Sequence, residues 1–229
     1  MKTLGLIGGT SWISTIEYYR IINQKINERL GAHNSAKLFL YSLNFEEFRP
    51  PSDPSQWGEL TNLFTEISNK LVQCGAHCIL LCANTPHMAA DELEKRITVP
   101  LIHIADATAT EIIKTGSKKI GLLGTKITME QDFFKKRLIQ KGIEPLVPGP
   151  DDRTFVDNTI FSELTNGIIK PETKKRYLQI IEKFREANAE GVIFGCTEIP
   201  FLIPADQSPL PSFNTTMIHA TAAVDFALQ

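Results

Sequence analysis

Short apolar segments alternate with longer amphipathic segments along almost the whole chain, and this alternation restricts the fold more than any other feature. Runs such as 3–9, 78–83 and 191–196 have the length of strands, whereas 56–74 and 172–189 have the apolar spacing of helices. The strands are apolar throughout, which is typical of strands buried on both faces. We therefore predict an α/β fold with mostly parallel sheets flanked by helices.

The chain also contains an internal repeat. Three segments of the first half recur in the same order in the second half at offsets of 111 to 116 residues: LGLIGGT as IGLLGT, ILL as VIF, and VPLIHI as LPSFNT. The repeat predicts two pseudosymmetric lobes. Because open α/β sheets bind ligands at the carboxyl ends of their strands, equivalent strand ends are expected to converge on one ligand in a cleft between the lobes.

Each lobe contains the same motif, a buried strand followed by a polar turn and the start of a helix. In the first lobe the turn is Asn84-Thr85-Pro86-His87, with Asn84 or Thr85 as N-cap. In the second lobe it is Cys196-Thr197-Glu198-Ile199-Pro200. The free N–H groups and the dipole at the start of a helix can bind a carboxylate. They also favour a thiolate, so we predict a lowered pKa and a thiolate at Cys196. Ordinary capping without a ligand is the alternative for both turns.

The turns after the first strand of each lobe are rich in glycine and hydroxyl groups. Gly8-Gly9-Thr10-Ser11 and Gly124-Thr125-Lys126-Ile127-Thr128 fit neither the dinucleotide nor the P-loop pattern. A hydroxyl-lined pocket is the better interpretation. The helix that follows the first of these turns has Ser14 and Glu17 at the spacing of a capping box.

Composition excludes several classes of protein. The chain has 24 basic and 26 acidic side chains, so it has no excess of positive charge that would favour binding to nucleic acid or to a membrane surface. No segment approaches the roughly 20 apolar residues of a membrane span, and the first residues fit a buried strand better than a signal peptide. We expect a cytoplasmic protein whose partner is a small molecule, an amino acid or another carboxylate.

Four cysteines are present, at positions 74, 78, 82 and 196, and they do not form the pattern of a secreted disulfide framework. Cys74 and Cys78 are expected to be buried, inert thiols. A metal site is the alternative for the first three, with His77 and His87 nearby, but zinc knuckles of the CxxC type are missing. We expect no metal and no cofactor.

Several motifs resemble the cofactor-independent aspartate/glutamate racemase family, and most closely its branch with broader amino-acid substrates. They are LGLIGGTSW at the start, NTPH, HIADAT, LLGTKITMEQDF and FGCTEI, in this order. The resemblance implies two lobes, the first of residues 1–104 with 210–229, whose last helix packs back, and the second of residues 105–209. It also implies a homodimer and a reaction without pyridoxal phosphate, in which two cysteines exchange protons on opposite faces of the substrate Cα.

The chain departs from the family at one of the two cysteine positions. The family motif places cysteine directly before the asparagine, where this chain has Ala83, and the internal repeat likewise pairs Ala83 with Cys196. Alanine carries no acid or base. Cys82 is displaced by one residue, and because strand residues alternate between faces it should point away from the substrate unless a bulge shifts it.

Three functions are compatible with this departure. The first is an amino-acid racemase with Cys196 as its principal thiol, slow or biased in direction, in which a water held by a neighbouring polar group serves the other face. The second is a single-cysteine decarboxylase of the same superfamily. The third is a non-catalytic carboxylate-binding protein.

The resemblance also suggests which residues contact the substrate. The matching positions are Thr10, Ser11, Asn84, Thr85, Thr125, Thr128, Thr197 and Glu198. Arg49 is a candidate for binding a side-chain carboxylate, since an arginine can do so with two hydrogen bonds. The proline-rich segment around it is a candidate loop over the cleft.

Overall fold

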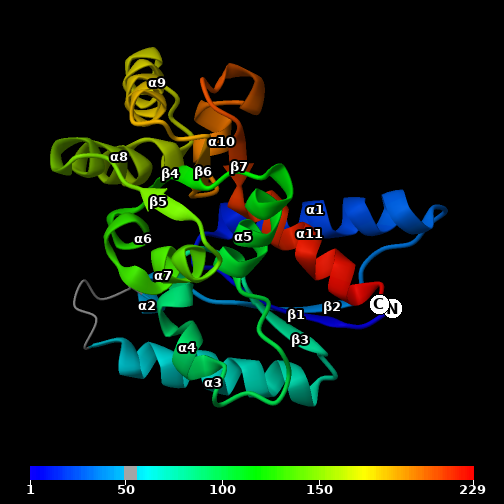
Figure 1. Ribbon diagram of the computed structural model, residues 1–229. Coiled ribbons are helices and arrows are strands. Elements are labelled where there is room, and N and C mark those ends of the chain that lie inside the picture. The colour runs from blue at the N-terminus through cyan, green and yellow to red at the C-terminus, as the bar shows by residue number, and fades with distance from the viewer. Residues whose placement is uncertain (49–55) are drawn as a thin grey trace. The chain divides into compact units, whose positions relative to one another are not determined.

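The computed structural model describes residues 1–48 and 56–229, which divide into two compact units (Figure 1). The first unit comprises Met1–Ile104 and Thr216–Gln229, and the second comprises Ala105–Thr215. The family resemblance predicts a return to the first lobe at residue 210. The structure keeps the chain in the second unit up to Thr215, because the strand at 212–214 pairs with the sheet of that unit.

The first unit contains a three-stranded parallel sheet in the order β2-β1-β3. Its strands are β1 (Leu4–Gly8), β2 (Leu38–Ser42) and β3 (Cys78–Leu81). The helices are α1 (Trp12–Leu30), α2 (Phe45–Phe48), α3 (Trp57–Gln73), the 3-10 helix η2 (Thr85–Ala89), α4 (Ala90–Leu93) and α11 (Thr215–Ala227). An isolated bridge between Ile79 and Leu101 extends the parallel pairing beyond β3.

One face of this sheet packs against α1 and α11. The shared core contains Leu4 and Leu6 of β1, together with Cys78, Leu80 and Cys82. These three residues are two positions apart, so the alternation of a regular strand continues past the last residue of β3. The structure therefore shows no reversal of faces at the end of β3.

Two local features of the first unit differ from expectation. Helix α1 begins at Trp12 with Ser11 as its N-cap, and the Ser11 side chain accepts a hydrogen bond from the Ser14 N–H. Ser14 is thus the third helical residue rather than the cap. Strand β2 is an edge strand whose residues are largely exposed, including 38% of Phe39 and 40% of Leu40, so it lacks the two-sided burial that its apolar sequence suggested.

The second unit has a parallel sheet in the order β5-β4-β6-β7. Its strands are β4 (Lys119–Gly124), β5 (Glu144–Leu146), β6 (Gly191–Gly195) and β7 (Ser212–Asn214). The helices are α5 (Ile104–Thr115), α6 (Lys126–Glu130), α7 (Asp132–Gln140), α8 (Pro150–Ser162), η3 (Leu164–Asn166), α9 (Pro171–Glu186), α10 (Ile199–Leu202) and η4 (Ala205–Gln207).

Helices α8, α9 and α10 share one core with β4 and β6 (Figure 1). Val192 and Phe194 lie in this core, and Cys196 packs against its edge. These three residues are again two apart, so Cys196 continues the face of β6 that packs on α9.

The two sheets follow the same plan. In each unit, the first strand along the chain lies between the second and the third. The third strand also pairs with one further segment on its other side, which is Leu101 in the first unit and β7 in the second. The predicted fold class, parallel sheets flanked by helices in two similar units, is confirmed. In the described part of the chain, no helix has the length and apolarity needed to cross a membrane.

Candidate functional site

The chain leaves β3 through a short turn that contains Ala83, Asn84 and Thr85. Asn84 is the residue before η2, and Pro86 occupies its first turn as predicted, although the helix is a five-residue 3-10 helix. Asn84 is 5% exposed, whereas Ala83 and Thr85 are half-buried. The turn therefore presents one small apolar and two polar side chains directly after a buried strand.

Cys82 lies in the core beneath this turn and not on its surface. Its side chain is completely buried with Tyr18 and Leu80, and burial raises the pKa of its thiol far above the usual value. Burial likewise raises the pKa of Cys78 to about 12. These surroundings favour an inert thiol at Cys82, which is the orientation expected from strand alternation.

Cys74 is exposed, although it was expected to be a buried thiol. It follows α3 and is exposed instead of buried, because the helix ends at Gln73 and the chain turns at the surface through Gly75, which has a positive φ of 103°. All four cysteines are free thiols in the structure.

The turn after β1 carries the hydroxyl groups that the sequence indicated. Thr15 accepts a hydrogen bond from the Gly9 N–H and donates one to the Ser11 carbonyl, so it fixes this turn. Thr10 is 8% exposed, and its Oγ1 atom has no hydrogen-bond partner among the residues described. A buried hydroxyl without a partner costs free energy, so Thr10 is a suitable contact for a ligand.

The turn after β6 contains the pair of residues with the clearest acid–base chemistry. The Cys196 thiol donates a hydrogen bond to Glu198 Oε2, with a sulfur–oxygen distance of 2.9 Å. Glu198 is 3% exposed and Thr197 is 9% exposed, while Cys196 is half-buried. The strand end thus holds a thiol and a carboxylate in direct contact.

The pKa of Cys196 is shifted opposite to the predicted direction. Burial raises it most, and the charge of the Glu198 carboxylate and the hydrogen bond to it raise it further. The N–H groups of Thr197 and Glu198 lower it by a smaller amount. These surroundings raise the pKa of Cys196, whereas the helix start alone predicted a lowered one, and they favour the protonated thiol over the thiolate.

Two threonines define the turn after β4. Thr125 caps α6 and accepts from the Thr128 N–H, and the two hydroxyl groups lie 3.1 Å apart. Thr128 is completely buried, beneath Gly124 and Gly195, where a side chain at either glycine would collide with it or with the adjacent strand. These glycines are needed so that the two strand ends can pack closely over Thr128.

The registers of the two sheets also align the turn after β3 with the turn after β6. Gly124 pairs with Gly195 in the second unit, and in the first unit Ile7 pairs with Leu81, so the next position places Gly8 beside Cys82. Since Gly8 and Gly124 are equivalent in the repeat, Cys82 corresponds to Gly195 and Ala83 to Cys196. The position equivalent to the thiol is thus occupied by a methyl group.

A buried group of histidines lies beside the turn after β3, and no sequence pattern identified the partners of its members. Tyr18 Oη and His219 Nδ1 are 2.7 Å apart, and His219 Nε2 is 2.6 Å from the Ile102 carbonyl. The His87 ring lies 4.6 Å from that of His103 and 5.5 Å from that of His219. Burial lowers the pKa of His219 to about 4.

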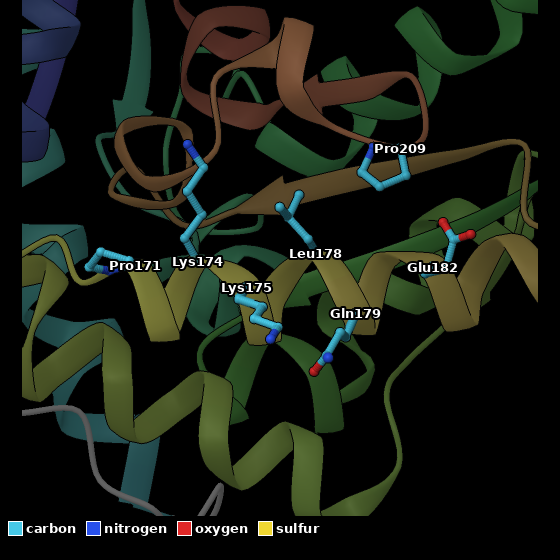
Figure 2. A pocket seen from close by; sticks show the side chains of 7 residues that line it. All are labelled: Pro171, Lys174, Lys175, Leu178, Gln179, Glu182 and Pro209. Carbon is cyan, nitrogen blue, oxygen red and sulfur yellow. The ribbon is translucent and has the colours of Figure 1, made fainter.

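Other surfaces offer less chemistry. Figure 2 shows a hollow along α9 that is lined by Pro171, Lys174, Lys175, Leu178, Gln179, Glu182 and Pro209. None of these residues belongs to the four strand-end turns. Among residues 1–48 and 56–229, no group of three or more His, Cys, Asp or Glu side chains is arranged to hold a metal ion. Arg49 lies outside the described residues.

Comparisons with known proteins identify the family of this chain. Residues 7–223 match the Asp/Glu/Hydantoin racemase family. A Yersinia pestis protein whose structure is that of a candidate Asp/Glu racemase is 46% identical, with a TM-score of 0.95 and complete coverage of both chains. An aspartate racemase homologue from Pyrococcus horikoshii is 36% identical, with a TM-score of 0.89 and complete coverage of both chains.

Curated relatives are more distant. The broad specificity amino-acid racemase RacX of Bacillus subtilis is 24% identical over 224 residues, which cover 96% of each chain. The chain spans 57% of the length of the first glutamate racemases that it matches. The match to the family covers nearly the whole chain, and two relatives of known structure exceed one third identity over their full length. The chain therefore belongs to the Asp/Glu/hydantoin racemase family.

Proposed function

We propose that this protein is an amino-acid racemase that needs no pyridoxal phosphate, that it acts on aspartate, glutamate or a broader set of amino acids, and that Cys196 is its principal acid and base. The observation that carries the proposal is the contact between Cys196 and Glu198 at the end of β6, in a chain that belongs to the Asp/Glu/hydantoin racemase family.

The raised pKa of the Cys196 thiol suits this residue to the role of acid first. A protonated thiol can give its proton to a carbanion at Cα and become a thiolate. To act as a base it must first lose its proton, and Glu198 Oε2, 2.9 Å from the sulfur, is placed to accept it. Glu198 thereby connects the two roles of one thiol.

The other face of Cα has no thiol in this proposal. Ala83 occupies the equivalent position and has no proton to exchange, and Cys82 is buried in the core. We propose that water held by neighbouring polar groups exchanges protons there, so that the enzyme is slow or favours one direction. The proposed substrate contacts are Thr10, Ser11, Asn84, Thr85, Thr125, Thr128, Thr197 and Glu198, with Arg49 for an acidic side chain.

The test is the incorporation of solvent deuterium at Cα. Each enantiomer of aspartate, glutamate and a panel of neutral amino acids is incubated with the protein in D₂O, and exchange and inversion are followed by NMR and chiral chromatography. Cys196→Ser should reduce both rates by at least about 10²-fold, the usual contribution of a positioned acid or base. Cys74→Ser, which changes an exposed thiol elsewhere, is the matched control. Exchange at the full rate in Cys196→Ser would refute the assignment.

Ala83 gives one observation in favour of a second function. A small residue in place of the first cysteine suits a decarboxylase, in which loss of CO₂ forms the carbanion and Cys196 alone protonates it. Release of CO₂ from a malonate-type substrate, without Cα exchange of any amino acid, would favour this alternative. Tight binding of amino acids with neither reaction would instead indicate a non-catalytic carboxylate-binding protein.

We also propose that the protein is a homodimer. Trp12, Ile16 and Tyr19 lie along one face of α1 and are 68%, 52% and 53% exposed. Large apolar side chains that gather on one helix face often mark a protein interface. Light scattering should give about twice the 25.6 kDa mass of one chain, and a monomer at micromolar concentration would contradict the proposal.

A further inference from the structure

We propose that His87 is a positioning residue that fixes the turn after β3 by replacing a main-chain donor that Pro86 removes. The inference rests on the proposed function, because this turn carries two of the proposed substrate contacts, Asn84 and Thr85. Its geometry comes from the first unit alone.

The two equivalent turns show which donor is missing. In the second unit, the Cys196 carbonyl accepts a hydrogen bond from the Ile199 N–H at 3.3 Å. The repeat pairs Cys196 with Ala83 and Ile199 with Pro86. Proline has no N–H, so the Ala83 carbonyl cannot receive the corresponding main-chain bond.

The His87 imidazole supplies the missing donor. Its Nδ1 lies 2.9 Å from the Ala83 carbonyl oxygen, and its Nε2 lies 3.2 Å from the Ile104 nitrogen. The Ile104 N–H can only donate, so Nε2 must accept, and the proton of the neutral ring is then on Nδ1 and is donated to Ala83. One ring therefore links the turn after β3 to Ile104, the last residue of this stretch of the first unit.

These bonds determine how the peptide groups of the turn are directed. The Ala83 carbonyl is held toward the His87 ring, and the Asn84 carbonyl accepts from the His87 N–H at 3.0 Å. In a planar trans peptide the N–H points opposite to the carbonyl of the preceding residue. The N–H groups of Asn84 and Thr85 therefore point away from His87, and rotation of either peptide would redirect these donors and the side chains beside them.

The surroundings make His87 suitable for this task. It is 1% exposed and its ring packs against the rings of His103 and His219. His219 is itself held by Tyr18 of α1 and by the Ile102 carbonyl. The imidazole is thus fixed from α1, α11 and the segment before α5, and it acts on the substrate only through the turn.

The test is a rescue experiment built on the second unit. His87→Leu removes both bonds and is expected to raise KM for the amino acid about tenfold with a smaller change in kcat, since two hydrogen bonds of ordinary strength are lost. Pro86→Ala restores an N–H at the position of Ile199. In the double variant Pro86→Ala/His87→Leu, KM should return to within about threefold of the wild-type value.

Two controls accompany the rescue. His77→Leu removes a histidine that also accepts a backbone N–H, that of Thr3, but lies at the opposite end of β3 and should leave KM unchanged. His87→Asn keeps a donor for the Ala83 carbonyl, but its shorter side chain cannot also reach the Ile104 N–H, so its KM should be intermediate. It also serves if His87→Leu does not fold.

Hydrogen exchange separates this inference from the proposed function. Amide protection at residue 87 and at Ile104 should fall in His87→Leu, and protection at residue 87 should recover in the double variant. This readout remains decisive even if the wild-type protein shows no Cα exchange, which would refute the racemase proposal alone. A folded His87→Leu variant with unchanged protection and KM, or a folded double variant without recovery, would overturn the role of His87.

Discussion

Replacement of Cys82 by serine gives a sharp test of which thiol takes part in the chemistry. The Cys82 side chain is completely buried in the core shared by β1, β3, α1 and α11. A serine hydroxyl at this place would lose its contact with water inside an apolar core. From mutational data, burying such a group costs about 1–3 kcal/mol of unfolding free energy.

This cost can be converted to a melting temperature. For a chain of this size, 1 kcal/mol corresponds to a change of about 2–4 °C, so Cys82→Ser should lower Tm by roughly 2–12 °C. The rate of Cα exchange by the folded protein should stay within about twofold of wild type. Cys196→Ser should show the reverse pattern, with a large loss of exchange and a change in stability below about 1 kcal/mol, because Cys196 is only half-buried.

The measurements are thermal unfolding by circular dichroism and deuterium incorporation at a temperature well below both midpoints. Cys82→Ala, which removes the sulfur without adding a hydroxyl, shows how much of the loss comes from the cavity alone. If Cys82→Ser lost Cα exchange at an unchanged Tm, the side chain would lie on the substrate face, and the alternation argued for residues 78, 80 and 82 would be refuted.

Three other changes give clear expectations. Glu198→Gln removes the charge that raises the pKa of Cys196, so alkylation of this thiol by iodoacetamide should reach its half-maximal rate at a lower pH than in wild type. His219 has a folded-state pKa of about 4 against a usual value of 6.5, so between these pH values the unfolded chain binds a proton that the folded chain excludes. The free energy of unfolding should therefore fall by about 3 kcal/mol as the pH drops from 6.5 toward 4, and the full stability is present above pH 6.5. Denaturation curves of His219→Gln, measured over the same range, should lack this pH dependence of the unfolding free energy. Ala83→Cys adds a thiol at the position equivalent to Cys196, and it should make the initial rates from the two enantiomers more nearly equal; an unchanged ratio in a folded variant would contradict that equivalence.

The elements around the candidate site could be predicted because their sequences are unambiguous. The strands that end before Thr10, Cys82 and Cys196 are continuous apolar runs, and each is followed by residues with turn or capping preference. The internal repeat paired Ala83 with Cys196 as equivalent positions, and the sheet registers give the same alignment.

Other features depend on tertiary contacts that no local pattern contains. The segment at 99–104 has the composition of a strand, but only Leu101 pairs with β3, and Ile104 already begins α5. The apolar sequence of β2 suggested a buried strand, whereas its place at the sheet edge leaves it exposed. Position within the sheet, not composition, decided both outcomes.

The direction of the pKa shift of Cys196 also depends on a contact that the sequence alone does not show. A thiol before a helix start predicts a lowered pKa, because nearby N–H groups favour the thiolate. The sequence does not reveal that the Glu198 side chain turns back to within 2.9 Å of the sulfur, and this charge together with burial outweighs the N–H groups. A residue two positions away can therefore reverse the sign of a shift that the local motif suggests.

The turns after β3 and β6 have equivalent backbones but differ in the position of a proline, and this changes which group closes each turn. In the second unit Ile199 supplies the N–H that closes the turn and Pro200 follows it, so the side chains of Cys196 and Glu198 are available to exchange protons with each other. In the first unit the proline comes one residue earlier, at Pro86, and a neutral imidazole with both nitrogens engaged must close the turn instead. The first turn is thus suited to hold a ligand still rather than to exchange protons with it, and the missing thiol at Ala83 agrees with this division. In the proposed racemase, the thiol and the carboxylate that exchange protons would thus belong to the second unit, and water would have to exchange the proton on the face that Ala83 leaves without a thiol.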